Sequence, residues 1–188
     1  FVELNNRNQN YNFKSETYKK YTNFSDTLSS WSYVQDFFAV KKLIDSKVIH
    51  KDSVIVNGNT GDFISGGHLP NYNRINTDNN SKFSFILEYI LQKHFSLWEN
   101  YFSSDQLEKI KNVILKSIPK SILNLREKEC YKVYEYIEFV NRQSNYVIQG
   151  QRVYDFFDIS WELPLWHDNY LDFWNKVPYK FKLNQELY

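Results

Sequence analysis

The chain has 188 residues, of which 42% are hydrophobic and 24% charged, with a formal net charge of +1. This balance excludes a broad basic surface for nucleic acid or for an anionic membrane, and no apolar run reaches the roughly 20 residues that a transmembrane helix needs. The single cysteine, Cys130, cannot form an internal disulfide, so we expect a reducing compartment, the cytoplasm. The absence of methionine indicates a fragment or a processed chain.

The first third of the sequence predicts an irregular segment, then a helix and then a short strand. Residues 1–30 are polar and rich in asparagine, and we expect an irregular segment there, followed over residues 31–188 by the C-terminal part of a domain. The stretch "WSYVQDFFAVKKLIDSKVIH" then has apolar residues at helical spacing. The β-branched run "SVIVN" predicts a short strand that ends at Gly58. Because one strand is too few for a sheet, we expect the other strands of an α/β fold to precede Phe1.

A mainly helical pattern follows. One helix is expected to begin near Ser81. Asp105 and Glu108 have the spacing of a capping box for the next helix, and Pro119 predicts its end.

The last part of the chain predicts one more long helix and a mixed tail. That helix is expected from Ser121 towards Tyr146, with Gly150 as its stop. The tail is expected to be extended as far as Pro164 and to continue in a short helix capped by Asp168.

The stretch "VIVNGNTGDFISGGHLP" carries the main functional signal, because it holds four of the five glycines of the chain. Glycine lets a ligand approach the main chain closely, and successive N–H groups after a strand bind anions such as phosphate. Asp62 lies among these glycines and would repel phosphate unless a cation lies between them. Mg²⁺ provides that link, because it takes one or two carboxylates together with phosphate oxygens and water. Thr60 and Ser65 have hydroxyl groups that can also donate to phosphate.

A plain turn between a strand and a helix explains the same glycines equally well from spacing alone. The stretch is neither a Walker A loop nor a dinucleotide-binding fingerprint, since it lacks Gly-Lys-Ser/Thr and G-x-G-x-x-G. Both interpretations stay open at this point.

"VIVNGNTGDFISGG" resembles the second nucleotide-site motif of the asparagine synthetase family, a strand followed by S-G-E-G-S-D-E-x-x-G-G. Gly58 matches the first glycine, Asp62 the aspartate, and Gly66 with Gly67 the closing pair. "WELPLWHDNYLDFW" is similar to the E-x-R-x-P-F-L-D segment of that family. These variant forms look more like the asparagine synthase-related proteins of bacterial surface-polysaccharide gene clusters than like the housekeeping enzyme.

The resemblance implies an α/β fold, namely part of an adenine-nucleotide α-hydrolase-like (PP-loop ATPase) domain with a large helical portion. It implies ATP and Mg²⁺ as cofactors, with Asp62 as the metal ligand. The residues expected to bind ATP or pyrophosphate are Gly58, Thr60, Gly61, Gly66 and Gly67. Glu162 is expected to be catalytic, Asn59 occupies the position of a catalytic glutamate of the family, and Asp168 is expected on the substrate side.

The implied reaction is an ATP-dependent amidation, in which an acceptor is adenylated and ammonia then displaces AMP. The acceptor is expected to be a small molecule or a sugar, and the ammonia to come from a glutaminase domain or subunit. Neither nucleic acid nor a membrane is expected as a partner. The family's S-G-G-x-D-S pyrophosphatase loop is absent, so this chain alone is expected to be inactive and to hold one wall of an ATP site.

Two other functions remain open. A degenerate paralogue that acts as a binding or scaffold subunit would explain why Asn59 replaces the glutamate. A relative that transfers sulfur or a sugar would use the same adenylation step.

The remaining candidate residues have simpler explanations. Two roles for Glu162, orientation of a substrate and a structural ion pair, agree equally well with the sequence. A loop histidine such as His68 is usually solvated. The histidines lack the spacing of a zinc site, and Cys130 lacks the activating neighbours of a nucleophile.

Overall fold

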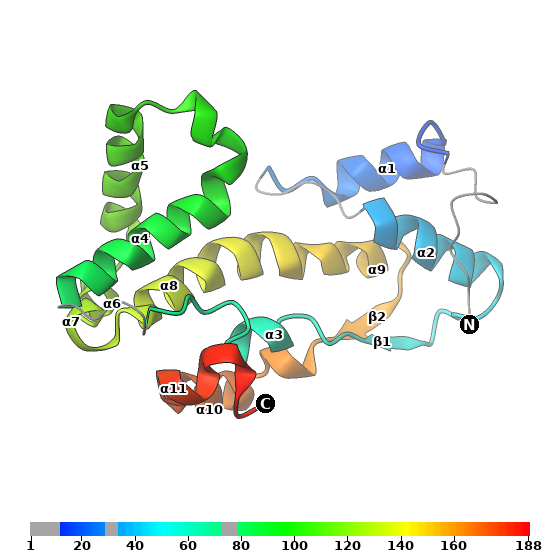
Figure 1. The fold of residues 1–188 in the computed structure, drawn as a ribbon. Helices are drawn as coiled ribbons and strands as arrows, with labels where there is room; N and C mark the ends of the chain where they lie inside the picture. Colours follow the sequence, from blue (N-terminus) through cyan, green and yellow to red (C-terminus); the bar gives the residue numbers. More distant parts are fainter. Residues whose placement is uncertain (1–11, 29–33, 73–78) are drawn as a thin grey trace. The chain divides into compact units, whose positions relative to one another are not determined.

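The computed structural model describes residues 12–28, 34–72 and 79–188 (Figure 1). These residues form two compact units. Unit 1 comprises the chain up to Thr60 together with Asn141–Tyr170, and unit 2 comprises Gly61–Val140 and Leu171–Tyr188. Residues on both sides of the expected boundary near residue 30 belong to unit 1.

Unit 1 combines helices with a small parallel sheet. Its elements are α1 (Glu16–Ser25), α2 (Val34–Asp45), β1 (Val54–Val56), η3 (Ile148–Gln151), α9 (Arg152–Phe156), β2 (Ser160–Glu162) and η4 (Pro164–Trp166). Strand β1 pairs with β2 in parallel, with Val54 opposite Ser160 and Val56 opposite Glu162. The predicted strand and the extended tail are confirmed, and the tail contains a second strand, β2, that the sequence analysis did not identify as a partner of β1.

The expectation of an irregular N-terminal segment is wrong for Glu16–Ser25, which forms helix α1. Ser15 caps this helix, because its Oγ accepts the N–H of Tyr18 at 3.2 Å. Tyr18, Tyr21 and Ser25 recur at helical spacing and are all buried. Tyr21 stacks on Phe37 of α2, with ring centroids 4.7 Å apart. The aromatic stripe, obscured by the polar residues around it, thus joins α1 to the core of unit 1. The part of the prediction that concerns residues 1–11 lies outside the described residues.

Unit 2 is helical in its described parts. Its elements are α3 (Gly61–Ile64), α4 (Asn79–Phe95), η1 (Ser96–Tyr101), α5 (Ser104–Ser117), α6 (Lys120–Leu123), α7 (Arg126–Glu129), α8 (Tyr131–Ile137), α11 (Tyr179–Lys182) and η5 (Leu183–Gln185). Its core gathers Ile86 and Ile90 of α4 with Val133, Tyr134 and Ile137 of α8.

Two elements continue across the boundaries between the units: the π-helix η2 (Glu138–Val147) and α10 (Asp168–Lys176).

Several helix ends differ from those expected. The capping box of α5 is formed by Ser103 and Gln106, two residues before the pair suggested by the sequence. The expected helix towards Tyr146 is divided into α6, α7, α8 and η2. Gly150 does not stop it, because η3 and α9 continue the helical path to Phe156.

Among the residues that the structure describes, none of the helices combines the length and the apolar character required to cross a bilayer.

Candidate functional site

The predicted site residues are divided between the two units. Gly58, Asn59, Thr60, Glu162 and Asp168 belong to unit 1. The rest belong to unit 2: Gly61, Asp62, Gly66 and Gly67.

In unit 1, the parallel pairing brings the ends of both strands together. The N–H of Asn57 donates to the carbonyl oxygen of Glu162 at 3.0 Å, just beyond the last residue of β1. The side chain of Glu162 is exposed, and no ion pair with Glu162 occurs among the described residues. The structural ion pair that would have explained this residue is therefore not found in the described part of the chain.

The short segment after β1 is held by the side chain of Asn57. Its Oδ1 accepts the N–H of Asn59 at 2.9 Å, while its Nδ2 donates to Oε1 of the buried Gln151 at 3.2 Å. Asx turns of this kind fix the direction of a loop as it leaves a strand.

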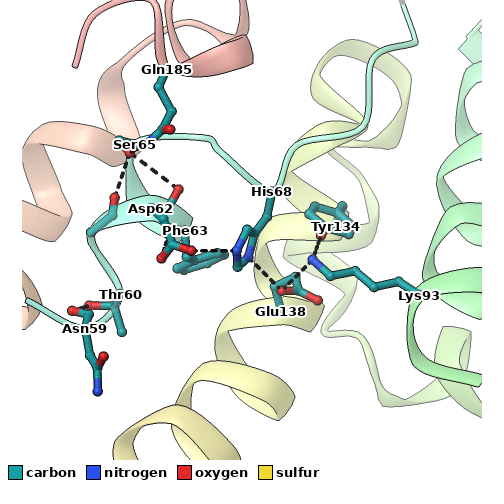
Figure 2. A network of polar contacts seen from close by, with 11 residues as sticks. Asn59, Thr60, Asp62, Phe63, Ser65, His68, Lys93, Tyr134, Glu138 and Gln185 are labelled. Atoms are coloured by element: carbon teal, nitrogen blue, oxygen red, sulfur yellow. Dashed lines mark hydrogen bonds and ion pairs between the residues drawn. The ribbon is translucent and has the colours of Figure 1, made fainter. Parts of the chain in front are cut away.

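Gly58 lies at a position where a larger residue would fit, whereas Thr60 has a backbone conformation that favours glycine. Gly58 is exposed, and a Cβ atom added to it would meet no heavy atom within 4 Å. Thr60 is buried and has a φ of 75°, which is strained for a β-branched residue. Its hydroxyl donates to the carbonyl oxygen of Asn59 (Figure 2). The fold therefore does not require glycine at position 58, and it holds threonine at position 60 in a conformation that favours glycine.

Gly66 and Gly67 have a packing role in unit 2. Gly66 has a φ of +98°, and an added Cβ would lie 2.3 Å from the carbonyl oxygen of Lys182. Both main-chain N–H groups are used inside the turn, Gly66 donating to Phe63 O at 3.1 Å and Gly67 to Asp62 O at 2.7 Å. Both amides are bonded within the turn, which favours the plain-turn interpretation for this closing pair.

Asp62 is exposed but held in place. Its Oδ1 accepts the N–H of Phe63 at 2.8 Å, and its Oδ2 lies 2.8 Å from Nε2 of His68. The Asp62 side chain is 64% exposed and that of His68 19%. An ionised carboxylate has about four acceptor positions, so these two contacts leave room for a further ligand. The expectation that His68 is simply solvated is wrong.

His68 connects Asp62 to a buried acid, Glu138 (Figure 2). The Nδ1 atom of His68 lies 3.4 Å from Glu138 Oε2. Two groups of α4 approach the same carboxylate, Lys93 Nζ at 3.1 Å from Oε2 and His94 Nε2 at 2.7 Å from Oε1. Lys93 Nζ also donates to the hydroxyl of Tyr134 at 2.5 Å. The side chain of Glu138 is 0% exposed, so a buried carboxylate would be costly here without these partners.

The charge of Glu138 is stabilised by its neighbours. Burial raises the pKa of Glu138, but its contacts with His68 and His94 and the charge of Lys93 lower it more strongly. The pKa therefore lies well below its ordinary value of 4.5. The carboxylate stays ionised and can orient His68, whose opposite nitrogen faces Asp62.

Glu138 is the residue of the candidate site that the sequence analysis did not identify. It is the first residue of η2, and π-helical segments recur at functional sites. The sequence contains one sign of a buried acid here, because Glu138 lies directly between two apolar residues, Ile137 and Phe139. Its partners lie far away in the sequence, at positions 68, 93 and 94, so nothing in the local pattern identified them.

None of the other predicted residues is among the contacts of this network in the described part of the chain. Asp168 is exposed at the first position of α10, where His167 Nδ1 accepts the N–H of Asn169 at 3.3 Å. Cys130 is buried, and burial raises the pKa of its thiol, which agrees with the expectation that it is no nucleophile.

A metal site made of protein groups alone does not occur in the described residues, since no set of three or more His, Cys, Asp or Glu side chains is arranged to hold an ion. A Mg²⁺ ion bound through Asp62 would depend on phosphate oxygens and water for its other ligands, as is usual for this ion.

Comparisons of the chain with models of protein families, with curated proteins and with solved structures found no match.

Proposed function

We propose that the chain contributes part of the nucleotide site of an ATP-dependent amido-ligase of the asparagine synthetase type, a PP-loop ATPase fold. In this proposal Gly58, Thr60 and Gly61 contact the phosphates, and Asp62 holds Mg²⁺. Gly66 and Gly67 instead give the turn its shape. The protein acts in the cytoplasm on a small-molecule or sugar acceptor, with ammonia from a glutaminase domain or subunit.

The observation that carries the proposal is the way in which Asp62 is held. An exposed carboxylate is normally free to rotate, and ordering it costs conformational entropy. Here His68 fixes it, and the fully buried Glu138 fixes His68. Support of this kind behind a group that faces solvent is typical of side chains that bind a ligand.

The segment before Asp62 supports the same function. The packing around Gly58 does not require glycine at this position. Close approach of a ligand to the main chain would explain why glycine is present. Thr60 stores backbone strain, which clusters at binding and catalytic sites. The segment also follows the carboxyl end of a parallel strand, where ligands bind in open α/β sheets.

Glu162 has a matching position within unit 1. It ends β2 beside the end of β1 and is exposed. We propose that its carboxylate orients the acceptor or the incoming ammonia. Asn59 in the place of a glutamate can accept or donate hydrogen bonds but cannot take up a proton.

The chemistry requires the departing pyrophosphate to be neutralised. An oxygen of the acceptor carboxylate attacks the α-phosphorus of ATP, and the bond to pyrophosphate breaks. The nitrogen of ammonia then attacks the acyl carbon, AMP leaves and a proton is released. Main-chain N–H groups and Mg²⁺ are suited to the first step, because they stabilise charge without reorganising.

The test measures binding of Mg²⁺ with pyrophosphate to the chain by isothermal titration calorimetry. We expect Asp62→Asn to weaken binding by about tenfold or more, since a charge-assisted contact contributes roughly 1.5–3 kcal/mol. Asp105→Asn is the matched control, because Asp105 is another exposed aspartate of unit 2. Equal binding by Asp62→Asn and the unchanged chain would remove the metal assignment.

A binding or scaffold subunit without catalytic activity is the second candidate. It is favoured by Asn59 and by the main-chain amides of Gly66 and Gly67, which are bonded within the turn. For this candidate the Glu138 network only stabilises the fold. Absence of Mg²⁺–pyrophosphate binding, with normal folding of the chain, would support it over the ligase.

A further inference from the structure

Unit 2 contains a pocket that the proposed nucleotide site does not use. Its volume is about 380 Å³, near the lower end of the range of about 300–1,000 Å³ for small-molecule sites. Helices α3, α8, α10 and α11 contribute to its walls. Most of the wall is apolar, with side chains that include Phe63, Ile64, Ile122, Leu125, Phe139 and Leu171.

A buried ion pair forms the polar part of the wall. Lys182 Nζ donates to Glu135 Oε1 at 2.6 Å, with only 3% of the lysine side chain and 15% of the glutamate side chain exposed. Lys132 also lines the pocket, from the same face of α8 as Glu135, and is paired with Glu129 at 3.0 Å. The apolar cavity therefore has one charged wall with two ammonium groups and the Glu135 carboxylate, while a second carboxylate in the lining, that of Asp172 on α10, is exposed.

The hydrogen bonds of Lys182 are incomplete within the protein. An ammonium group has three N–H donors, and Glu135 is the one described acceptor at Lys182 Nζ. Buried charged groups need their remaining hydrogen bonds satisfied. A ligand oxygen in the pocket, or water in its absence, can provide this.

The position of Lys182 is built into the fold. The main chain at Lys182 packs so closely on Gly66 that any side chain at position 66 would overlap with it. A second contact lies next to it, from Gln185 Nε2 to Ser65 Oγ at 2.6 Å. The closing glycine pair thus explains why a lysine near the end of the chain lies so deep.

We propose that this pocket binds a small carboxylic acid with an apolar body, whose carboxylate accepts hydrogen bonds from Lys182 and whose body lies against Phe139 and Leu171. A neutral ligand such as an amide can accept a hydrogen bond from Lys182 through its carbonyl oxygen, but it lacks the stronger contact that a carboxylate makes with an ammonium group. An amine would add a further positive charge beside Lys182 and Lys132. A phosphate dianion would cost more to desolvate among apolar walls than a carboxylate.

The test compares hydrocinnamate with hydrocinnamamide, which share one body and differ in charge. Calorimetric titration of the 188-residue chain should show the acid binding about tenfold more tightly than the amide, as expected for hydrogen bonds to a charged group. Equal affinities for acid and amide, or no binding of either compound, would overturn the proposal.

A double variant and a control variant test whether Lys182 causes the preference for the acid. The double substitution Lys182→Met with Glu135→Leu removes both charges, so that no carboxylate is left unpaired in the core. We expect it to bind acid and amide equally. Lys180→Met is the matched control, because Lys180 belongs to the same helix but is exposed and does not line the pocket. A preference for the acid that survives in the double variant would contradict the assignment.

The proposal is independent of the amido-ligase proposal. Its residues all belong to unit 2, and neither probe contains phosphate. Loss of the preference for the acid would leave the binding of Mg²⁺ with pyrophosphate untouched.

Discussion

The glycine-bearing segment, residues 58–67, contains glycine at its opening end and at its closing end for different reasons. At the closing end, Gly66 has a positive φ and contacts the main chain at Lys182, so the fold itself requires glycine. At the opening end, Gly58 faces open space and has no such constraint. One pattern in the sequence therefore combines a glycine that packing requires with a glycine that packing does not require.

The same contrast holds for the neighbours of these glycines. His68 follows the closing end and is anchored through Glu138, whereas Thr60 follows the opening end in a strained conformation. Stability should therefore depend on the closing end, and ligand binding on the opening end. Three substitutions and one control test the part of this division that concerns stability.

The largest loss of stability is expected from Glu138→Gln. Removing the buried charge leaves His68, His94 and Lys93 without their common partner, which costs about 3–5 kcal/mol at neutral pH. Urea unfolding followed by tryptophan fluorescence measures the change in the free energy of unfolding. A change below about 1 kcal/mol, the size of an exposed ion pair, would show that the network is dispensable.

The same variant should also change the pH dependence. The pKa of Glu138 is lowered in the folded chain from its ordinary value of 4.5, so its contribution is complete above that value and is lost as the pH falls below it. Wild type and Glu138→Gln should therefore converge in stability on acidification. A gap that stays constant below pH 4.5 would contradict this.

A smaller loss is expected from Gly66→Ala, of about 2–3 kcal/mol from the positive φ and the overlap with Lys182. Gly58→Ala is the control and should stay within about 0.5 kcal/mol of wild type. The comparison is made by thermal unfolding of both variants. Equal effects at the two positions would remove the contrast between the two ends of the segment.

The smallest loss is expected from Gly67→Ala. An added Cβ would lie 3.0 Å from Asp62 O and 3.1 Å from Gln185 Cδ. Small shifts relieve such contacts, and the expected cost is about 1 kcal/mol. Thermal unfolding checks the value, and a cost above that of Gly66→Ala would reverse the order of the two positions.

Regular patterns made part of the fold predictable. The β-branched run became β1, the extended tail became β2, and the helix near Ser81 became α4. Helix α1 was missed because its buried stripe consists of tyrosines within a polar, asparagine-rich segment. A periodicity of 3.6 residues does not predict where a helix is interrupted. It therefore could not show the break at residues 124–125 or the change to π-helix at Glu138.

The candidate site was predictable only where its signal is local. Asp62 among the glycines could be identified because loop composition is a local property. The support from Glu138 could not, because a buried acid is understood only through its partners, which lie 44, 45 and 70 positions away in the sequence. The pairing of Lys182 with Glu135 was hidden for the same reason, with 47 positions between them.

The outer face of the two-stranded sheet has a consequence for Glu162. Val54 and Val56 of β1 are 53% and 68% exposed, and their partners across the sheet are Ser160 and Glu162. Uncovered valines on a short strand invite contact with the valines of another molecule, and a charge beside them opposes such stacking. The charge of Glu162 lies opposite Val56 in the sheet, where it disfavours such stacking.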